Sequence, residues 1–271
     1  MKIIYKIITV ILFFFTQNSF ASKEILSTHV YNNFAIQSIG ISNANDEMHA
    51  DKIVISKSRF VPNPVSPKLF SIPKIDKPIW TITAKDLHVS EEACLEIDAL
   101  LCRDYKEMYK AGETMCYDTC ISNGPYFVAY DASAKKVYLD AGTDVSGTGG
   151  IPKFLFVADI DKKQITYLNT VVAPYDAYLS TNGTYLALSQ GYNGIEVYNT
   201  HTGSNIEING KENELTKQAL HVSLGNIRWL SDTELQYEDM FFDDKLQRNF
   251  STTKNIFNVE SKKIVDTHMM K

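Results

Sequence analysis

The chain has 271 residues, of which 44% are hydrophobic and 22% are charged, and its formal net charge is −5. This composition is typical of a globular protein with a substantial core and argues against long disordered regions. The acidic balance leaves no polybasic face to hold phosphates, so nucleic acids and anionic membrane surfaces are poor candidate partners.

Residues 1–21 have the features of a secretory signal peptide. Lys2 and Lys6 come first, the apolar run 7–15 follows, and Ser19-Phe20-Ala21 puts small residues where a signal peptidase reads. The apolar run is shorter than the roughly 20 residues that span a bilayer, and an uncleaved short anchor is the alternative. We expect cleavage after Ala21, a periplasmic or secreted protein, and no integral membrane segment after cleavage. Loss of the leader takes the formal charge to −7.

The region 22–87 is predicted to be β-structure. Strand patterns cover Val30–Ser42, Lys52–Ser58, Leu69–Ile72 and Ile79–Thr83. The proline-rich stretch Pro62–Pro67 cannot lie in a central strand, so we interpret it as a linker or a sheet edge.

One acidic cluster in this region, Asp46–Asp51, holds three carboxylates and one imidazole. Such groups can ligate a divalent cation. The spacing matches neither a calcium loop nor a two-histidine zinc motif, so a solvated hairpin tip is the favoured interpretation and we predict no metal.

Residues 88–120 form a predicted helical insertion closed by disulfides. Ser90 is suited to cap a helix, and an apolar stripe follows it until Gly112. All four cysteines lie here, which in an exported chain indicates two disulfides. Because a helical separation of eight residues is about 12 Å, Cys94 and Cys102 should each bond to the returning segment. Sequence does not fix the connectivity, and we favour the nested pairs Cys94–Cys120 and Cys102–Cys116 over a thiolate metal site, whose C-x₂-C knuckles are missing.

The stretch Pro174–Asn209 has the clearest β pattern. Its four runs are rich in β-branched and aromatic residues and are separated by Asn/Gly clusters that tolerate positive φ; they are Tyr175–Ser180, Thr184–Leu188, Ile195–Asn199 and Ile206–Ile208. Four strands in about 36 residues match the size of one antiparallel propeller blade.

Parts of this pattern recur along the chain. Leu179–Leu188 resembles Ile121–Tyr130 before it and Leu230–Leu235 after it. Hairpins with Asp or Asn before the turn, and a Lys pair or Gly within it, recur at Val128–Val137, Val157–Ile165, Val197–Ile206 and Ile256–Ile264. We therefore predict turns near Asp161, His201 and Ser261, with strands at Phe154–Ala158 and Ile195–Asn199.

From Ile121 to the C-terminus, this strand-turn-strand rhythm resembles the divergent β-propeller repeats of exported bacterial proteins, the WD40-like group that includes the TolB type. The resemblance implies an all-β fold, a small or irregular propeller-like array of antiparallel sheets over 121–271, with further blades supplied by the N-terminal region. A β-sandwich could use the same strands and is the alternative.

Two motifs invite a catalytic or phosphate-binding interpretation, and neither is favoured. The Gly-rich run Gly142–Gly150 lacks the lysine spacing of a P-loop and does not precede a helix, so we interpret it as a loop. His221 and Ser223 alternate on a strand without a nucleophile elbow. No pattern in the chain predicts a cofactor.

The most unusual surface candidate is Tyr237–Asp244, four carboxylates interleaved with three aromatics. We predict an exposed acidic edge suited to a basic protein partner, since aromatic anchors supply interface energy and charges steer encounter. The predicted binding residues are Tyr192, Tyr237, Glu238, Asp239, Phe241, Asp243 and Asp244. The sequence thus favours an exported non-catalytic binding protein, for example of inhibitor or immunity type, over the alternative of a secreted hydrolase or lyase on a propeller scaffold.

Overall fold

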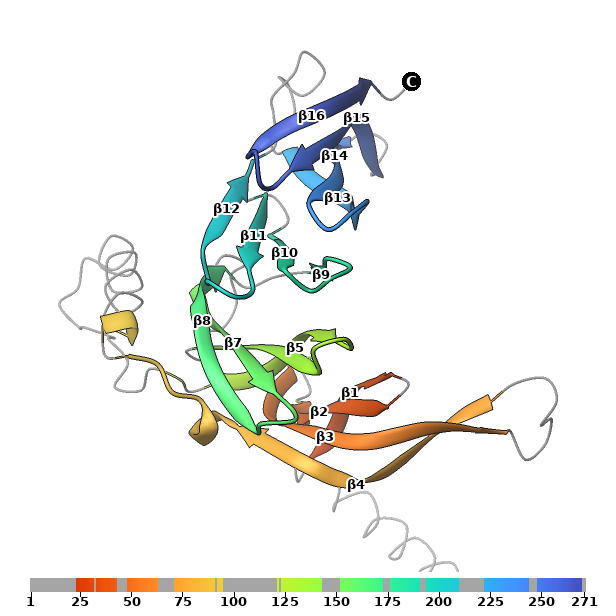
Figure 1. Ribbon diagram of the computed structural model, residues 1–271, viewed down its shortest axis with the longest axis vertical. Coiled ribbons are helices and arrows are strands. Elements are labelled where there is room, and N and C mark those ends of the chain that lie inside the picture. The colour runs from red at the N-terminus through yellow and green to blue at the C-terminus, as the bar shows by residue number, and fades with distance from the viewer. Residues whose placement is uncertain are drawn as a thin grey trace, which may run out of the picture. The chain divides into compact units, whose positions relative to one another are not determined.

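The computed structural model describes residues 23–31, 33–42, 48–62, 71–90, 92–94, 121, 123–142, 152–172, 176–190, 194–209, 222–243 and 248–269. The chain divides into two compact units, one that ends at Thr83 and one that begins at Ala84. Within the described ranges, the strands form four four-stranded antiparallel sheets, and each sheet is a meander in chain order (Figure 1).

The first unit contains one sheet, which we call sheet A. Its strands are β1 (Glu24–Val30), β2 (Phe34–Ser42), β3 (Met48–Pro62) and β4 (Ser71–Thr83). Ile36 lies opposite Ile55, and Ile53 lies opposite Ile82, and these side chains are fully buried. The predicted strand Val30–Ser42 is present as β2, its first residue Val30 ends β1, and β1 itself was not predicted.

The second unit contains the short 3₁₀ turn η1 (Ala84–Asp86) and three sheets. Sheet B consists of β5 (Asn123–Asp131), β6 (Lys136–Gly142), β7 (Pro152–Asp159) and β8 (Gln164–Val172). Sheet C consists of β9 (Asp176–Leu179), β10 (Tyr185–Ser189), β11 (Ile195–Asn199) and β12 (Asn205–Ile208). Sheet D consists of β13 (Val222–Trp229), β14 (Glu234–Asp243), β15 (Arg248–Asn258) and β16 (Lys263–Met269).

Sheet C confirms the four strands predicted within Pro174–Asn209, and the predicted strands at Phe154–Ala158 and Ile195–Asn199 are also present. Four separate meanders have the strand order of propeller blades and differ from the two packed sheets of a sandwich. The array of antiparallel sheets is therefore confirmed over the described part of 121–271, and 23–83 supplies one further sheet.

The turns near Asp161, His201 and Ser261 are confirmed, and they share one construction. The Asp or Asn that ends the strand accepts a backbone N–H three residues on, as in Lys162 N to Asp159 Oδ1 (2.9 Å) and Ser261 N to Asn258 Oδ1 (2.9 Å). The residue four positions after it has positive φ, and in these three turns it is Lys163, Gly203 or Lys262. Lys135 in the β5–β6 turn, four positions after Asp131, follows the same pattern. An Asx-type bond therefore fixes the start of each turn, and a left-handed residue returns the chain to the next strand.

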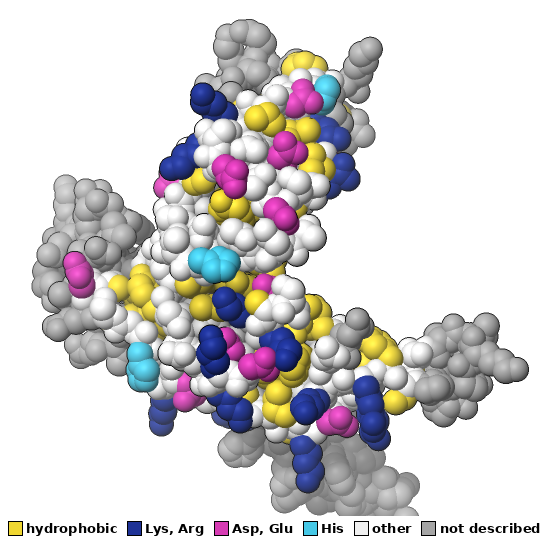
Figure 2. Space-filling model, in the orientation of Figure 1, with side chains coloured by type: hydrophobic (Ala, Val, Ile, Leu, Met, Phe, Trp, Pro, Cys, Tyr) yellow, Lys and Arg dark blue, Asp and Glu magenta, His cyan; other side chains and the backbone are white. Residues whose placement is uncertain are grey.

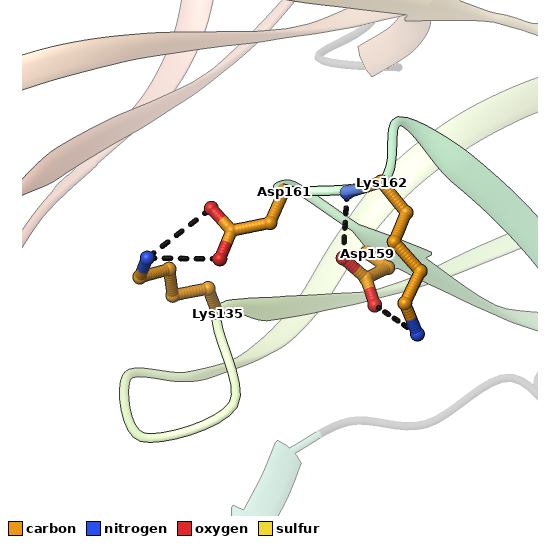
Figure 3. Close-up of polar contacts among 4 residues, drawn as sticks. All are labelled: Lys135, Asp159, Asp161 and Lys162. Carbon is orange, nitrogen blue, oxygen red and sulfur yellow. Dashed lines mark hydrogen bonds and ion pairs between the residues drawn. The ribbon is translucent and has the colours of Figure 1, made fainter.

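Ion pairs add to these turns in sheet B (Figure 3). Lys135 Nζ lies 2.8 Å from Asp161 Oδ2, which links the β5–β6 turn to the β7–β8 turn, and Lys162 Nζ lies 3.2 Å from Asp159 Oδ2. Lys135, Asp161 and Lys162 are exposed, so each pair contributes at most about 1 kcal/mol to stability.

The repeat inferred from Leu179–Leu188 and Ile121–Tyr130 compares strands at different positions, because Thr184–Leu188 contains the second strand of sheet C and Tyr126–Tyr130 the first strand of sheet B. Backbone hydrogen bonds show which positions are equivalent in the three sheets. Ile160, Thr200 and Val259 each donate N–H to the turn between the first two strands of their own sheets, at the carbonyls of Lys135, Thr184 and Thr233. The match to Leu230–Leu235 is correct in position, and the Val128–Val137 hairpin joins the first and second strands rather than the third and fourth.

Sheets B, C and D pack face to face through two apolar clusters. One lies between sheets B and C and is formed by residues such as Tyr138, Val157, Leu186 and Tyr198. The other lies between sheets C and D and contains Val197, Leu235, Tyr237 and Phe257; the ring of Trp229 packs against it. Sheet C lies between the two clusters, which explains why its inner strand β10 is apolar on both faces: Leu186 and Leu188 belong to one cluster and Ala187 to the other.

The predicted helical insertion lies mostly outside the described residues. Its start is present: Ala93 N–H donates to Ser90 Oγ (3.2 Å), and Cys94 N–H donates to the Ser90 carbonyl (3.1 Å), which is the predicted cap. Cys94 is disulfide-bonded. Cys102, Cys116 and Cys120 lie outside the described ranges, so both pairings stay predictions. The described part contains no helix long and apolar enough to cross a membrane.

Candidate protein-interaction site

The predicted acidic edge is not exposed where the structure describes it. Tyr237, Glu238 and Asp239 are only 1%, 9% and 3% accessible. They lie on β14, an inner strand of sheet D between β13 and β15, and Tyr237 packs in the cluster between sheets C and D. The exposure expected for these three residues is therefore wrong, because sheet C covers the face of β14 that carries Tyr237, and side chains from β13 and β15 enclose Glu238 and Asp239.

Glu238 is held by hydrogen bonds on the face of sheet D opposite that cluster. Its Oε2 accepts from Ser251 Oγ (2.6 Å) and from Asn226 Nδ2 (2.7 Å). Asn226 has positive φ in a bulge of β13, which turns its side chain toward β14. The Ser251 bond, followed by the Asn226 bond, lowers the pKa of Glu238.

Asp239 takes part in a separate network on the other face. Its Oδ2 accepts from Thr253 Oγ1 and from Asn255 Nδ2 (2.8 Å), and Asn255 Oδ1 accepts from Thr267 Oγ1 (3.0 Å). The network joins β14, β15 and β16. Burial, and then the charge of Asp239, raise the pKa of Tyr237 to about 12. These acids stabilise sheet D from within.

The side chains of the remaining predicted binding residues lie outside the described part of the structure. Phe241 and Asp243 lie at the end of β14, opposite Phe250 and Arg248. Tyr192 and Asp244 lie outside the described residues, as do His221 and most of Gly142–Gly150. Of the Asp46–Asp51 cluster, Asp51 lies on β3 and pairs with Lys23 (2.6 Å). Among the side chains the structure describes, no group of three or more could hold a metal ion.

A further buried carboxylate, Asp140 on β6, is also satisfied. Lys153 Nζ lies 3.1 Å from its Oδ1 and 4.4 Å from the centre of the Tyr126 ring. Burial raises the pKa of Asp140, and the lysine opposes that rise. This ion pair ties β7 to β6 and leaves neither charge available for a ligand.

One exposed candidate lies in sheet A, where β3 and β4 continue beyond their neighbours. Pairing of β2 with β3 ends at Lys57, but β3 and β4 stay paired as far as Pro62 and Ser71. We call this two-stranded extension, residues 58–62 and 71–75, the ribbon. Figure 1 shows it as a two-stranded extension of β3 and β4, and Figure 2 shows hydrophobic and basic side chains in this part of the surface.

The ribbon exposes three large apolar side chains. Phe60 is 49% accessible, Ile72 is 37% and Ile75 is 36%. The strand register places Phe60 opposite Pro73 and Ser58 opposite Ile75, so Phe60 and Ile75 share one face. An apolar face of this kind outside any core marks an interaction surface when it is contiguous.

The opposite face is basic. Arg59 lies directly opposite Lys74, and Val61 opposite Ile72 beside them. Lys57 and Lys77 flank the base of the ribbon, and Asp76 is the single carboxylate among 57–62 and 71–78. Arg59, Lys74, Lys57 and Lys77 are all exposed.

The outer edge of β4 is poorly suited to pair with another strand. β4 is an edge strand of sheet A, and it contains Pro73 and Pro78 as well as two lysines. Prolines and lysines on an edge oppose the addition of a further strand. The two side-chain faces of the ribbon are therefore better suited to contact a partner than this edge of β4.

Sequence reasoning placed an edge or linker at Pro62–Pro67 and missed the ribbon. The signal was local alternation on both sides of the prolines: Arg59-Phe60-Val61 before them, and Ile72-Pro73-Lys74-Ile75 after them. The sequence alone does not show that the two segments pair with each other across the proline-rich stretch. That pairing sets the register between them.

No protein-family model matches this sequence, and no curated protein matches it. The solved structures that it resembles include a luciferin-regenerating enzyme, with 6% identity over 93% of this chain and 81% of that chain and a TM-score of 0.36. They also include the β-propeller domain of Cps50 (Swd1) from Myceliophteria thermophila, with 8% identity over 91% and 89% and a TM-score of 0.32. The C-terminal WD40 domain of Sif2 has 9% identity over 93% and 77% and a TM-score of 0.32. At these scores the likeness carries no functional conclusion, and the fold description rests on the four meanders.

Proposed function

We propose that this chain is a non-catalytic binding protein that engages a protein partner through the ribbon of sheet A. The observation that carries the proposal is the exposure of Phe60 and Ile75 on one face of a two-stranded extension. An isolated pair of strands is marginally stable in water, because it has no core to bury. Burial of this face against a partner would supply that core.

The size of the effect follows from the residue types. An aromatic anchor at the centre of an interface commonly accounts for about 2 kcal/mol or more of binding free energy. Phe60 and Ile75 together can therefore decide whether the partner is held. Export to the periplasm or the exterior, and an inhibitor or immunity role there, belong to the same proposal and are supported by the leader sequence of residues 1–21.

The test compares two double variants by quantitative affinity capture from periplasmic extract, with the mature protein as bait. F60S/I75S should lose a protein that wild type retains. V265S/M269S is the matched control, because Val265 and Met269 are at least as exposed (54% and 64%) but lie on β16 of sheet D. Equal recovery by both variants would contradict the proposal, provided that both keep the wild-type melting temperature.

A further inference from the structure

The opposite face of the ribbon carries an arrangement that the apolar face does not explain. Arg59 and Lys74 are directly opposite cross-strand neighbours, so their Cβ atoms are typically about 4.5–5.5 Å apart. Like charges at such positions destabilise a pair of strands. Within the described residues, neither side chain forms an ion pair or a side-chain hydrogen bond, and both are exposed.

A carboxylate placed between the two cations would relieve this repulsion. The guanidinium of Arg59 can donate two parallel hydrogen bonds to a carboxylate, and the ammonium of Lys74 adds a point charge beside it. Val61 and Ile72 lie next to the pair on the same face and supply aliphatic contact. Together these groups fit an Asp or Glu side chain that has an apolar neighbour.

The charge of the first unit agrees with this choice. Residues 22–83 contain seven Lys or Arg and five Asp or Glu, whereas residues 84–271 contain 18 and 27. A basic arm on an otherwise acidic chain steers toward an acidic partner and away from basic ones. The expectation of a basic partner depended on an exposed acidic edge, and Glu238 and Asp239 are buried.

We propose that Arg59 and Lys74 form a clamp for a carboxylate on an acidic, aliphatic segment of the partner protein. This inference rests on the proposed function and names the chemistry of its partner. The clamp faces away from Phe60 and Ile75, so the segment wraps the ribbon and contacts both faces.

Lys74→Glu tests the clamp without damage to the fold. The substitution places an acid opposite Arg59, so the repulsive cross-strand pair becomes an attractive one and the melting temperature should stay equal or rise slightly. Binding of an acidic segment should fall at least tenfold, because the clamp then presents a carboxylate. Lys263→Glu is the matched control, since it makes the same charge change at an exposed position in sheet D.

The probe is a library of 12-residue peptides in which Asp or Glu alternates with apolar residues, together with an isosteric library in which Asn and Gln replace the acids. Wild type and K263E should enrich the acidic library over the amide library, and K74E should not. Equal enrichment of the two libraries by wild type would overturn the clamp. If F60S/I75S abolishes that enrichment, the proposal that the apolar face binds a partner still stands. Failure of both libraries to bind would also overturn the clamp.

Two further measurements test whether the clamp binds something other than an acidic protein segment. Tighter binding of a 12-base-pair DNA duplex than of the acidic peptides would assign the clamp to phosphates and overturn the proposal. Self-association of wild type in sedimentation experiments that K74E abolishes would assign it to a second copy of this chain, with the same result. A monomer that prefers acidic peptides is the outcome we expect.

Discussion

The end of β14 and the ribbon of β3 and β4 are built from similar residues and differ in what surrounds them. Both alternate charged with large apolar side chains. In β14, the neighbouring strands and the packing of sheet C against sheet D bury Tyr237 and Asp239 and give each charge a partner. In the ribbon there is no third strand, so Phe60, Arg59 and Lys74 stay accessible. The position of a strand in its sheet and the packing on its faces therefore decide whether such a pattern is buried or exposed.

Truncation of an aromatic side chain in each region should separate these roles most clearly. Tyr237→Ala should lower the free energy of unfolding by about 3–5 kcal/mol, because it opens a cavity in the cluster between sheets C and D. Phe60→Ala should change it by no more than about 0.5 kcal/mol, since that side chain is half-exposed. Urea titration of both variants measures the difference. Comparable losses would show that the ribbon is part of the core.

Removal of a carboxylate from each region should give a smaller difference in stability. Asp239→Ala should destabilise the protein by about 2 kcal/mol, because Thr253 and Asn255 lose a buried acceptor. Asp76→Ala in the bulge at the base of the ribbon is the control and should have little effect. If the melting temperature of the Asp239→Ala variant equals that of wild type, the buried network contributes no net stability.

The pH dependence of stability should be a smaller effect with a defined sign. The folded-state pKa of Glu238 is lowered from 4.5, mainly by the Ser251 hydrogen bond. Its contribution is therefore present above pH 4.5 and is lost as the pH falls through the folded-state pKa. Glu238→Gln should melt with a smaller drop in Tm between pH 6 and pH 3.5 than wild type does. An identical drop in both proteins would remove Glu238 from the acid response.

These two regions also show which structural features could be predicted from the sequence. Period-two alternation and Asn/Gly turns are local signals, and they predicted the strands of sheet C and the turns at Asp161, His201 and Ser261. Inner or outer position depends on which strands pair, and nothing near Glu238 encodes the approach of Ser251 or Asn226. The same limit hid the pairing of Arg59 with Lys74, whose strands are separated by the proline-rich stretch. Similar composition also led the inferred repeat to match β10 with β5, although β10 is the second strand of its sheet and β5 is the first strand of its own.

The most direct test of the ribbon as the binding surface is site-specific photocrosslinking in cells that express the protein. A benzophenone amino acid at position 60 should give a covalent adduct with one acidic protein, identified by mass spectrometry, and the adduct should be lost when Lys74→Glu is added. The same probe at position 269, on the exposed end of β16, should give none. Adducts at position 269 but not at position 60, or equal adducts at both, would contradict the assignment of recognition to the ribbon.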